Sequence, residues 1–168
     1  MDVLSTGVDI GRVHNFTALV TAQGSSIRHA ERVPLSNDYP AIVDHVERYH
    51  GAVGGRLVMD ATGVGRAVFD TLVSKGVDVI GVLITGGKSV SFKNGIYGVP
   101  KQELLRPLRT VLENQTIQNA KGLPAGDALV AELKDFRREV NERGHDTYGG
   151  KVEHDDLVIT RALALWCV

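Results

Sequence analysis

The sequence predicts an α/β fold in which helices flank a central mixed β-sheet. Within residues 4–34, three consecutive apolar segments are joined by short connections, which is typical of an antiparallel meander. Within residues 57–84, a strand, a helix and a second strand follow one another, which predicts a right-handed parallel crossover. Residues 155–166 are apolar nearly all round, so we expect them to form a helix that packs deep in the core.

The first half of the chain divides clearly into these elements. Residues 4–10, 16–23 and 27–34 have the composition of the three meander strands, and Gly24, Ser25 and Ser26 separate the last two. A helix is expected over residues 39–49, where apolar side chains recur at helical spacing behind the candidate caps Asn37 and Asp38. The crossover then consists of a strand at 57–60, a helix at 64–74 that ends at Lys75 and Gly76, and a strand at 77–84.

The second half is dominated by two amphipathic helices. One is expected from Pro100 to about residue 114, and the other over residues 125–141, each with a stripe of leucines on one side. No repeat, low-complexity tract or linker interrupts the 168 residues, so we interpret them as a single domain. Weaker signals predict a loop or weak hairpin at 86–97, a short edge strand at 116–119 and a last short strand at 148–152.

The composition is that of an ordinary globular protein with 43% hydrophobic and 23% charged residues. The net charge of −1 shows no overall basic excess, so any contact with nucleic acid has to be local. A single cysteine, Cys167, fits a reducing compartment, and no apolar run approaches the length of a membrane span. The first residues lack the pattern of a signal peptide, so we expect a cytoplasmic protein without membrane contact.

Aspartates at the ends of predicted elements are the most informative residues. Asp9 and Asp60 each end an apolar strand, and Asp155 and Asp156 begin the last helix. A carboxylate at the end of a buried strand is costly unless something cationic compensates it. Oxygen ligands suit Mg²⁺ or Mn²⁺, and two such ions about 3.5–4 Å apart are a standard arrangement for phosphodiester chemistry.

Each aspartate also has a structural interpretation, and both interpretations stay open at this stage. Asp155 has the position of a helix N-cap, and Asp9 has that of a turn residue after a strand. Asp60 could cap the following helix, although Thr62 could do so without it. Asp155 and Asp156 lie about 100° apart on a helix, so we favour Asp156 as the direct metal ligand.

Four segments in this order resemble the C-terminal nuclease domain of tailed-bacteriophage large terminase subunits. The likeness runs from about residue 4 to the end of the chain and includes Glu132, Leu133 and Phe136 in the helix before the last motif. Members of that family often carry another acidic residue after the first strand, where this chain has His14 and Asn15. The four segments are residues 7–11 (GVDIG), 60–65 (DATGVG), 100–104 (PKQEL) and 154–157 (HDDL).

The resemblance implies an RNase H-like fold and a metal-dependent endonuclease. Such an enzyme would hydrolyse phosphodiester bonds of double-stranded DNA with two Mg²⁺ or Mn²⁺ ions, cutting concatemeric viral DNA during genome packaging. Full-length subunits also carry an N-terminal ATPase motor, and this sequence has no GxxxxGK[ST] loop to supply one. The implied partners are double-stranded DNA, the ATPase domain, the small terminase subunit and the portal, in the cytoplasm of an infected bacterium.

The resemblance also implies roles for individual residues. Asp9 would bridge the two metals, Asp60 would bind one, and Asp156 or Asp155 the other. His154 would position a ligand or carry a proton, with an ordinary exposed histidine as the alternative. Apart from the resemblance, Lys88, Lys93 and Lys101 are candidates to line a DNA path, because neutralising phosphates is the main sequence-independent source of affinity; they are equally well explained as solvated surface lysines.

Other functional classes remain open at the level of sequence. A cellular RNase H or a junction resolvase would use a similar set of carboxylates. Sugar-kinase and actin-like ATPases have similar strand ends and turns, but they need two related domains and a longer chain. A non-catalytic interaction domain with a vestigial site is the alternative that is not an enzyme.

Overall fold

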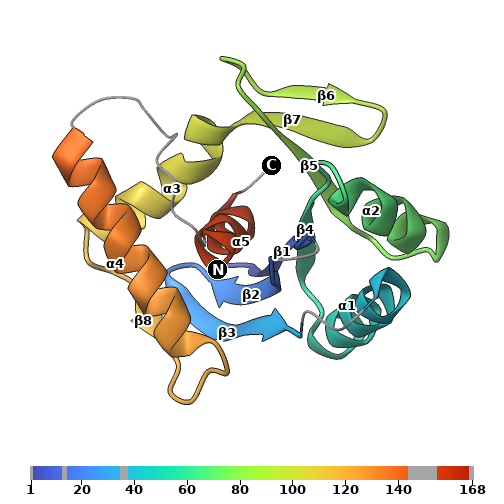
Figure 1. Cartoon of the computed structure of the whole chain (residues 1–168), viewed down its shortest axis with the longest axis horizontal. Helices are drawn as coiled ribbons and strands as arrows, with labels where there is room; N and C mark the ends of the chain where they lie inside the picture. Colours follow the sequence, from blue (N-terminus) through green and yellow to red (C-terminus); the bar gives the residue numbers. More distant parts are fainter. Residues whose placement is uncertain (1, 13–14, 35–37, 144–154, 167–168) are drawn as a thin grey trace.

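An eight-stranded sheet lies between two layers of helices in the computed structural model, which describes residues 2–12, 15–34, 38–143 and 155–166 (Figure 1). The order of the strands across the sheet is β6-β7-β5-β4-β1-β2-β3-β8. The strands are β1 (Leu4–Asp9), β2 (Thr17–Gln23), β3 (Ser26–Val33), β4 (Arg56–Asp60), β5 (Ile80–Thr85), β6 (Ser91–Lys93), β7 (Ile96–Pro100) and β8 (Gln118–Asn119), and the helices are α1 (Tyr39–Val53), α2 (Gly65–Ser74), α3 (Lys101–Glu113), α4 (Gly126–Arg143) and α5 (Asp156–Leu165).

The mixed sheet has the connectivity that the sequence predicts. Strands β1, β2 and β3 form an antiparallel meander. The chain then crosses over through α1 and α2, so that β1, β4, β5 and β7 run parallel to one another. The carboxyl ends of these four parallel strands therefore lie along one edge of the sheet, which is where ligands bind in sheets of this kind.

Each face of the sheet has its own hydrophobic core. Helices α1 and α2 pack on one face, where Val46, Val68 and Leu72 meet side chains of β1 and β4. Helices α3, α4 and α5 cover the other face, and Figure 1 shows α5 in the centre of the molecule. Every residue from Asp156 to Ala164 is buried, as expected for a helix without a polar face. Within the described ranges, no helix combines the length and the apolarity that a membrane span needs.

The structure differs from the sequence prediction at the boundaries of two elements. Helix α1 ends at Val53 rather than at residue 49. Strand β5 begins at Ile80 rather than at residue 77, because the amide of Val77 still donates to Leu72 O, 3.0 Å away, in the turn that closes α2. Of the two alternatives expected for residues 86–97, the hairpin is present: β6 pairs with β7 from Ser91 opposite Gly98 to Lys93 opposite Ile96, with Asn94 and Gly95 at positive φ in the turn, and β7 extends the sheet beyond β5. The expected edge strand is β8, paired with β3, whereas the expected strand at 148–152 lies outside the described residues.

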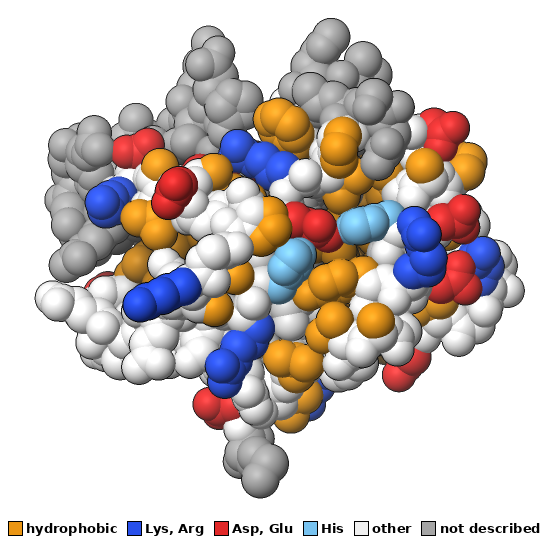
Figure 2. All heavy atoms as spheres, turned by 90° about the horizontal axis from the view of Figure 1, so that it is seen from below, with side chains coloured by type: hydrophobic (Ala, Val, Ile, Leu, Met, Phe, Trp, Pro, Cys, Tyr) orange, Lys and Arg blue, Asp and Glu red, His pale blue; other side chains and the backbone are white. Residues whose placement is uncertain are grey.

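The surface carries mixed charges. On the face shown in Figure 2, acidic and basic side chains are interspersed and form no single basic stripe. Some of these charges join elements of the fold: the Glu31 carboxylate on β3 lies 2.6 Å from Nε2 of His45 on α1. The His29 side chain also faces Glu31, at 3.5 Å. The two histidines hold the pKa of Glu31 below its usual range.

Helix α5 packs directly against the backbone of β1 at Gly7. A Cβ atom at this position would lie 2.0 Å from Thr160 O and 2.9 Å from Ala164 N, so only glycine permits the contact. Because Thr160 is one helical turn after Asp156, the contact places the start of α5 beside the carboxyl end of β1. A glycine at position 7 therefore determines where the last helix begins relative to Asp9.

We predict that Gly7→Ala lowers the free energy of unfolding by about 2–4 kcal/mol, because either α5 or β1 has to move to accommodate the methyl group. Urea denaturation monitored by circular dichroism measures this change. Gly51→Ala is the matched control, since a Cβ there would meet nothing within 4 Å and alanine is the better helix former. Equal stabilities of Gly7→Ala and wild type would contradict the close contact.

Candidate active site

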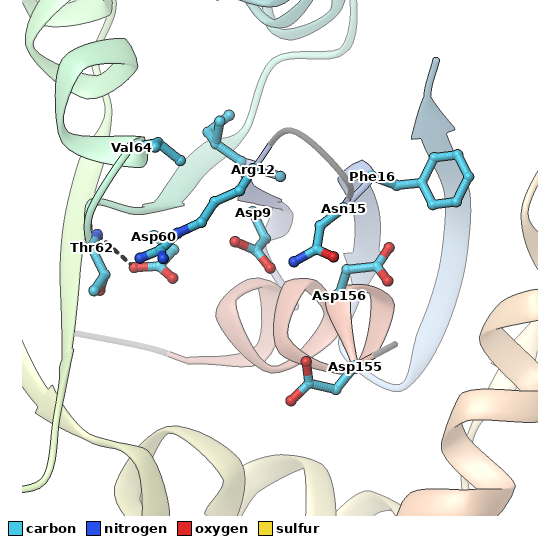
Figure 3. Close-up of a pocket in the computed structure, with 11 residues that line it drawn as sticks. Asp9, Arg12, Asn15, Phe16, Asp60, Thr62, Val64, Asp155 and Asp156 are labelled. Carbon is cyan, nitrogen blue, oxygen red and sulfur yellow. Dashed lines mark hydrogen bonds between the residues drawn. The ribbon is translucent and has the colours of Figure 1, made fainter. Parts of the chain in front are cut away.

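Two aspartates lie side by side at the carboxyl edge of the sheet. Strands β1 and β4 are parallel, with Val8 opposite Met59. Asp9 and Asp60, which come next, therefore end neighbouring strands at the same level. Figure 3 shows both side chains turned into a common pocket. The sequence prediction that distant strand ends bring these two carboxylates together agrees with this placement.

The third group comes from the start of α5. Asp156 is the first residue of the helix and is 8% exposed, whereas Asp155 precedes the helix and makes no capping hydrogen bond with its side chain. Both line the pocket with Asp9 and Asp60. Asp155 therefore occupies the N-cap position of α5 without capping the helix through its side chain.

The pocket has a volume of about 200 Å³ and is formed by three parts of the chain. One wall is the end of β1 with the segment that follows it, the second is the turn after β4, and the third is the start of α5. In Figure 3, Asn15 points into the pocket beside Asp9. The lining residues are Asp9, Ile10, Gly11, Arg12, Asn15, Phe16, Asp60, Thr62, Val64, Asp155 and Asp156.

Asp9 has a strongly perturbed carboxyl group. Burial, together with the charges of Asp60, Asp156, Asp155 and Glu132, raises its pKa from 3.8 to about 8, and burial is the largest cause. Within the described residues, its side chain has no hydrogen-bond or ion-pair partner. A carboxylate in this position is stable only beside positive charge.

Asp60 is held by the turn that follows it. Its Oδ1 accepts a hydrogen bond from the amide of Thr62 at 2.8 Å, and Thr62 Oγ1 accepts one from the amide of Ile84 at 3.1 Å. Burial raises the pKa of Asp60, and the bonds from Thr62 oppose the shift. The turn is tight: a Cβ on Gly65 would lie 2.1 Å from Asp60 O. The hydrogen bond from the Thr62 amide fixes one carboxylate oxygen of Asp60 and leaves the other directed to the pocket.

Asp156 is held by charged side chains from two other elements. Arg32 on β3 donates to both of its carboxylate oxygens, from Nε at 3.0 Å and from Nη2 at 3.2 Å. The same Nη2 donates to Oε1 of Glu132 on α4. Oε2 of Glu132 accepts from the amides of Leu157 and Val158, at 3.0 and 3.1 Å, and so caps α5.

The carboxylates do not form a finished cage for a metal ion. Within the described parts of the chain, no three acidic, histidine or cysteine side chains converge closely enough to hold one. Two of the carboxylates face cationic side chains: Asp156 faces Arg32, and Asp155 lies 3.7 Å from Nζ of Lys101.

None of the three predicted lysines lines the pocket. Lys101 Nζ lies 3.7 Å from Asp155, a residue that lines the pocket. Lys88 lies in the exposed connection between β5 and β6, beyond the carboxyl end of β5, and Lys93 is exposed on β6, at the edge of the sheet. His154 lies outside the described residues.

Sequence reasoning missed four residues of this region. Arg12 and Asn15 line the pocket, and Arg12 Nη2 lies 3.2 Å from where a Cβ on Gly63 would be. Arg32 and Glu132 hold the start of α5. The family resemblance gave a signal for two of them: Glu132 belongs to the helix segment that it includes, and Asn15 stands where family members often carry another acidic residue. Nothing in the pattern around Arg32 distinguishes it from a solvated arginine on a strand.

The structure is similar to solved nuclease domains of phage large terminases. The large terminase nuclease of thermophilic phage G20c with bound magnesium gives a TM-score of 0.67 at 19% identity, covering 98% of this chain and 80% of that chain. The same nuclease with bound zinc gives 0.65 at 20% identity, covering 97% and 80%. The nuclease domain of the Sf6 large terminase subunit gives 0.61 at 11% identity, covering 99% and 89%. No protein-family model and no curated protein sequence matches the chain.

Sheet order, helix placement and these similarities define the class: the chain has an RNase H-like fold. More particularly, it has the fold of the nuclease domain of large terminase subunits, and the similarity covers nearly all of this chain. The fold class predicted from the sequence is therefore confirmed.

The raised pKa of Asp9 predicts a pH-dependent loss of stability in EDTA. The folded-state pKa, about 8, lies above the ordinary 3.8, so folding favours the protonated carboxyl. Its contribution is fully present below pH 4 and is lost as the pH rises through 8. Asp9→Asn should therefore be more stable than wild type at pH 8, by about 1–3 kcal/mol, with a smaller difference at pH 4.

Urea denaturation at several pH values tests this prediction. Asp70→Asn, a change at an exposed aspartate on α2, is the control and should show no such trend. A difference between Asp9→Asn and wild type that stays constant from pH 4 to 8 would show that Asp9 is not desolvated.

Proposed function

We propose that this chain is a metal-dependent endonuclease that hydrolyses phosphodiester bonds of double-stranded DNA. The observation that carries the proposal is the arrangement of Asp9, Asp60 and Asp156 around one pocket, at the carboxyl edge of the sheet. Solved structures of the same fold are nucleases, and individual ones hold magnesium, zinc, cobalt or manganese. The site and the fold therefore support the same chemistry.

The residues of the pocket fit hard divalent cations. Its acidic residues offer carboxylate oxygens, the ligands that Mg²⁺ and Mn²⁺ prefer, and the described residues that line it include no histidine or cysteine. Asp9, buried beside other acids and without a partner of its own in the described structure, is the group that a cation would stabilise most. Two such cations, when bound, would stabilise the attacking and leaving oxygens of the phosphate and lower the pKa of the attacking water.

The side chains of the pocket would have separate roles in binding the cations and the DNA phosphate. Asp9, at the centre, would contact both cations, while Asp60 and Asp156 would each contact one, with Asp155 as a further oxygen donor at the rim. Thr62 keeps Asp60 oriented through its amide. Arg12 extends over the pocket from the segment after β1, where its guanidinium is suited to the charge of a DNA phosphate (Figure 3).

The biological setting is part of the same proposal. A nuclease of this kind would cut concatemeric viral DNA during genome packaging, in the cytoplasm of an infected bacterium. Its partners there would be the terminase ATPase domain, the small terminase subunit and the portal. We further propose that the chain acts as a single nuclease domain, with His154 near the ligands of the last helix.

The purified protein can be tested on four substrates with Mn²⁺ or Mg²⁺. We expect nicking and linearisation of plasmid duplex, with weaker cleavage of an RNA–DNA hybrid and of a four-way junction, and no ATP turnover. A preference for the hybrid or for the junction would instead assign the chain to an RNase H or to a resolvase. Turnover of ATP without cleavage would overturn the nuclease proposal.

Asp9→Ala and Asp60→Ala should each reduce plasmid cleavage more than about a hundredfold, because each would remove an oxygen ligand that no neighbour replaces. Initial rates at saturating Mn²⁺, with circular dichroism to verify folding, measure the effect. Asp70→Ala, at an exposed aspartate on α2, should cleave at the wild-type rate. Cleavage retained in both pocket variants would refute the catalytic assignment.

Lys88 and Lys93 are predicted to contribute to DNA affinity through phosphate charge. The double variant Lys88→Ala/Lys93→Ala should weaken binding to all duplex sequences alike and lower the slope of log affinity against log salt by about 1–2. Fluorescence anisotropy over a salt series measures both. Lys75→Ala is the control, because Lys75 pairs with Glu47 at 2.9 Å, away from the pocket. An unchanged salt slope would exclude these lysines from the DNA path.

A further inference from the structure

Three charged side chains from different elements meet where α5 begins. Arg32 on β3 bonds both Asp156 and Glu132, and the guanidinium also lies over the Phe16 ring, 5.0 Å from its centroid. Asp156 and Glu132 are 8% and 7% exposed, so neither acid is freely solvated. Phe16 and Asp156 line the pocket, which places this network directly behind one of its walls.

We propose that Arg32 and Glu132 are positioning residues: together they fix the carboxylate of Asp156 and the start of α5 so that Asp156 can bind a divalent cation. The inference rests on the proposed function, since it concerns the same pocket. It assigns a role to two residues outside the carboxylate set that the sequence predicted.

The geometry of the arginine supports this role. The guanidinium donates to both oxygens of Asp156, which fixes the plane of the carboxylate as a single hydrogen bond could not. Each carboxylate oxygen has two lone pairs, so one on each oxygen remains for a further ligand. Phe16 and Glu132 limit the movement of the guanidinium itself, through ring contact and hydrogen bonding.

Glu132 fixes the backbone that carries Asp156. Its Oε2 accepts from two amides of the first turn of α5, while Asp155 makes no capping bond with its side chain. The helix is therefore capped by a residue of α4 rather than by its own sequence. Because Oε1 bonds Arg32, the single Glu132 side chain positions both the backbone and the guanidinium.

Charge gives the network a second function. Without Arg32, the carboxylates of Asp156 and Glu132 would lie close together with little solvent and no countercharge. Arg32 would also compete with a cation for Asp156 if its only effect were electrostatic. Positioning and competition therefore predict opposite changes in metal affinity when the guanidinium is altered.

Two conservative variants separate these possibilities. Arg32→Lys keeps the positive charge and loses the two-pronged bond. Glu132→Gln keeps an amide oxygen for the two α5 amides and places its NH₂ group against Arg32, so it breaks only the link between the arginine and the helix cap. Arg66→Lys is the matched control, because Arg66 bonds both oxygens of Asp70 on the surface of α2.

The primary measurement is Mn²⁺ binding to the protein without DNA, by electron paramagnetic resonance, alongside thermal unfolding. We expect Arg32→Lys and Glu132→Gln each to bind Mn²⁺ on the order of tenfold more weakly than wild type, and Arg66→Lys to bind as wild type does. At saturating Mn²⁺, both should also cut plasmid more slowly, because Asp156 is no longer held in one orientation.

Two results would overturn the inference. Unchanged Mn²⁺ affinity together with a lower melting temperature would mean that the network serves folding alone. Tighter Mn²⁺ binding in Arg32→Lys would mean that Arg32 competes with the cation. Wild-type protein that binds Mn²⁺ through Asp9 but cuts no DNA would refute the proposed function, and the binding series would still decide whether Arg32 and Glu132 position Asp156.

Discussion

The contact between α5 and β1 at Gly7 is the constraint on which the rest of the site depends. A helix normally packs on a sheet through side chains, but here the absence of a Cβ lets the helix backbone approach the strand itself. The register of α5 is thereby fixed against β1 to within one turn. Asp156 then has to lie near Asp9, whatever the conformation of the segment between α4 and α5.

That placement concentrates negative charge, and the surrounding structure compensates it unequally. Asp156 has a guanidinium, Asp155 has a lysine, and Asp60 has a backbone amide. Asp9, which is flanked by the others, has no partner within the described structure, and burial together with the neighbouring acids raises its pKa to about 8. The peripheral carboxylates are thus organised by protein groups, while the central one depends on what binds in the pocket.

The sequence predicted those parts of the site that local patterns encode. Asp9 and Asp60 were recognisable because each interrupts an apolar strand at its end, and parallel strands place their ends together. The last helix was recognisable from its uniform apolarity. Arg32 was not recognisable, because its partners lie 100 or more positions away in sequence and a charged residue on a meander strand usually faces solvent. The hairpin β6–β7 was ambiguous because all of β6 is exposed and shows no alternation of apolar residues.

Dependence of α5 on Glu132 and Gly7 affects the order in which the molecule can assemble. The helix has no cap of its own, and both its anchoring strand and its capping helix come earlier in the chain. During synthesis on the ribosome, β1 and β4 emerge long before the element that completes the pocket. A nascent or prematurely terminated polypeptide would therefore present two of its acids without the third.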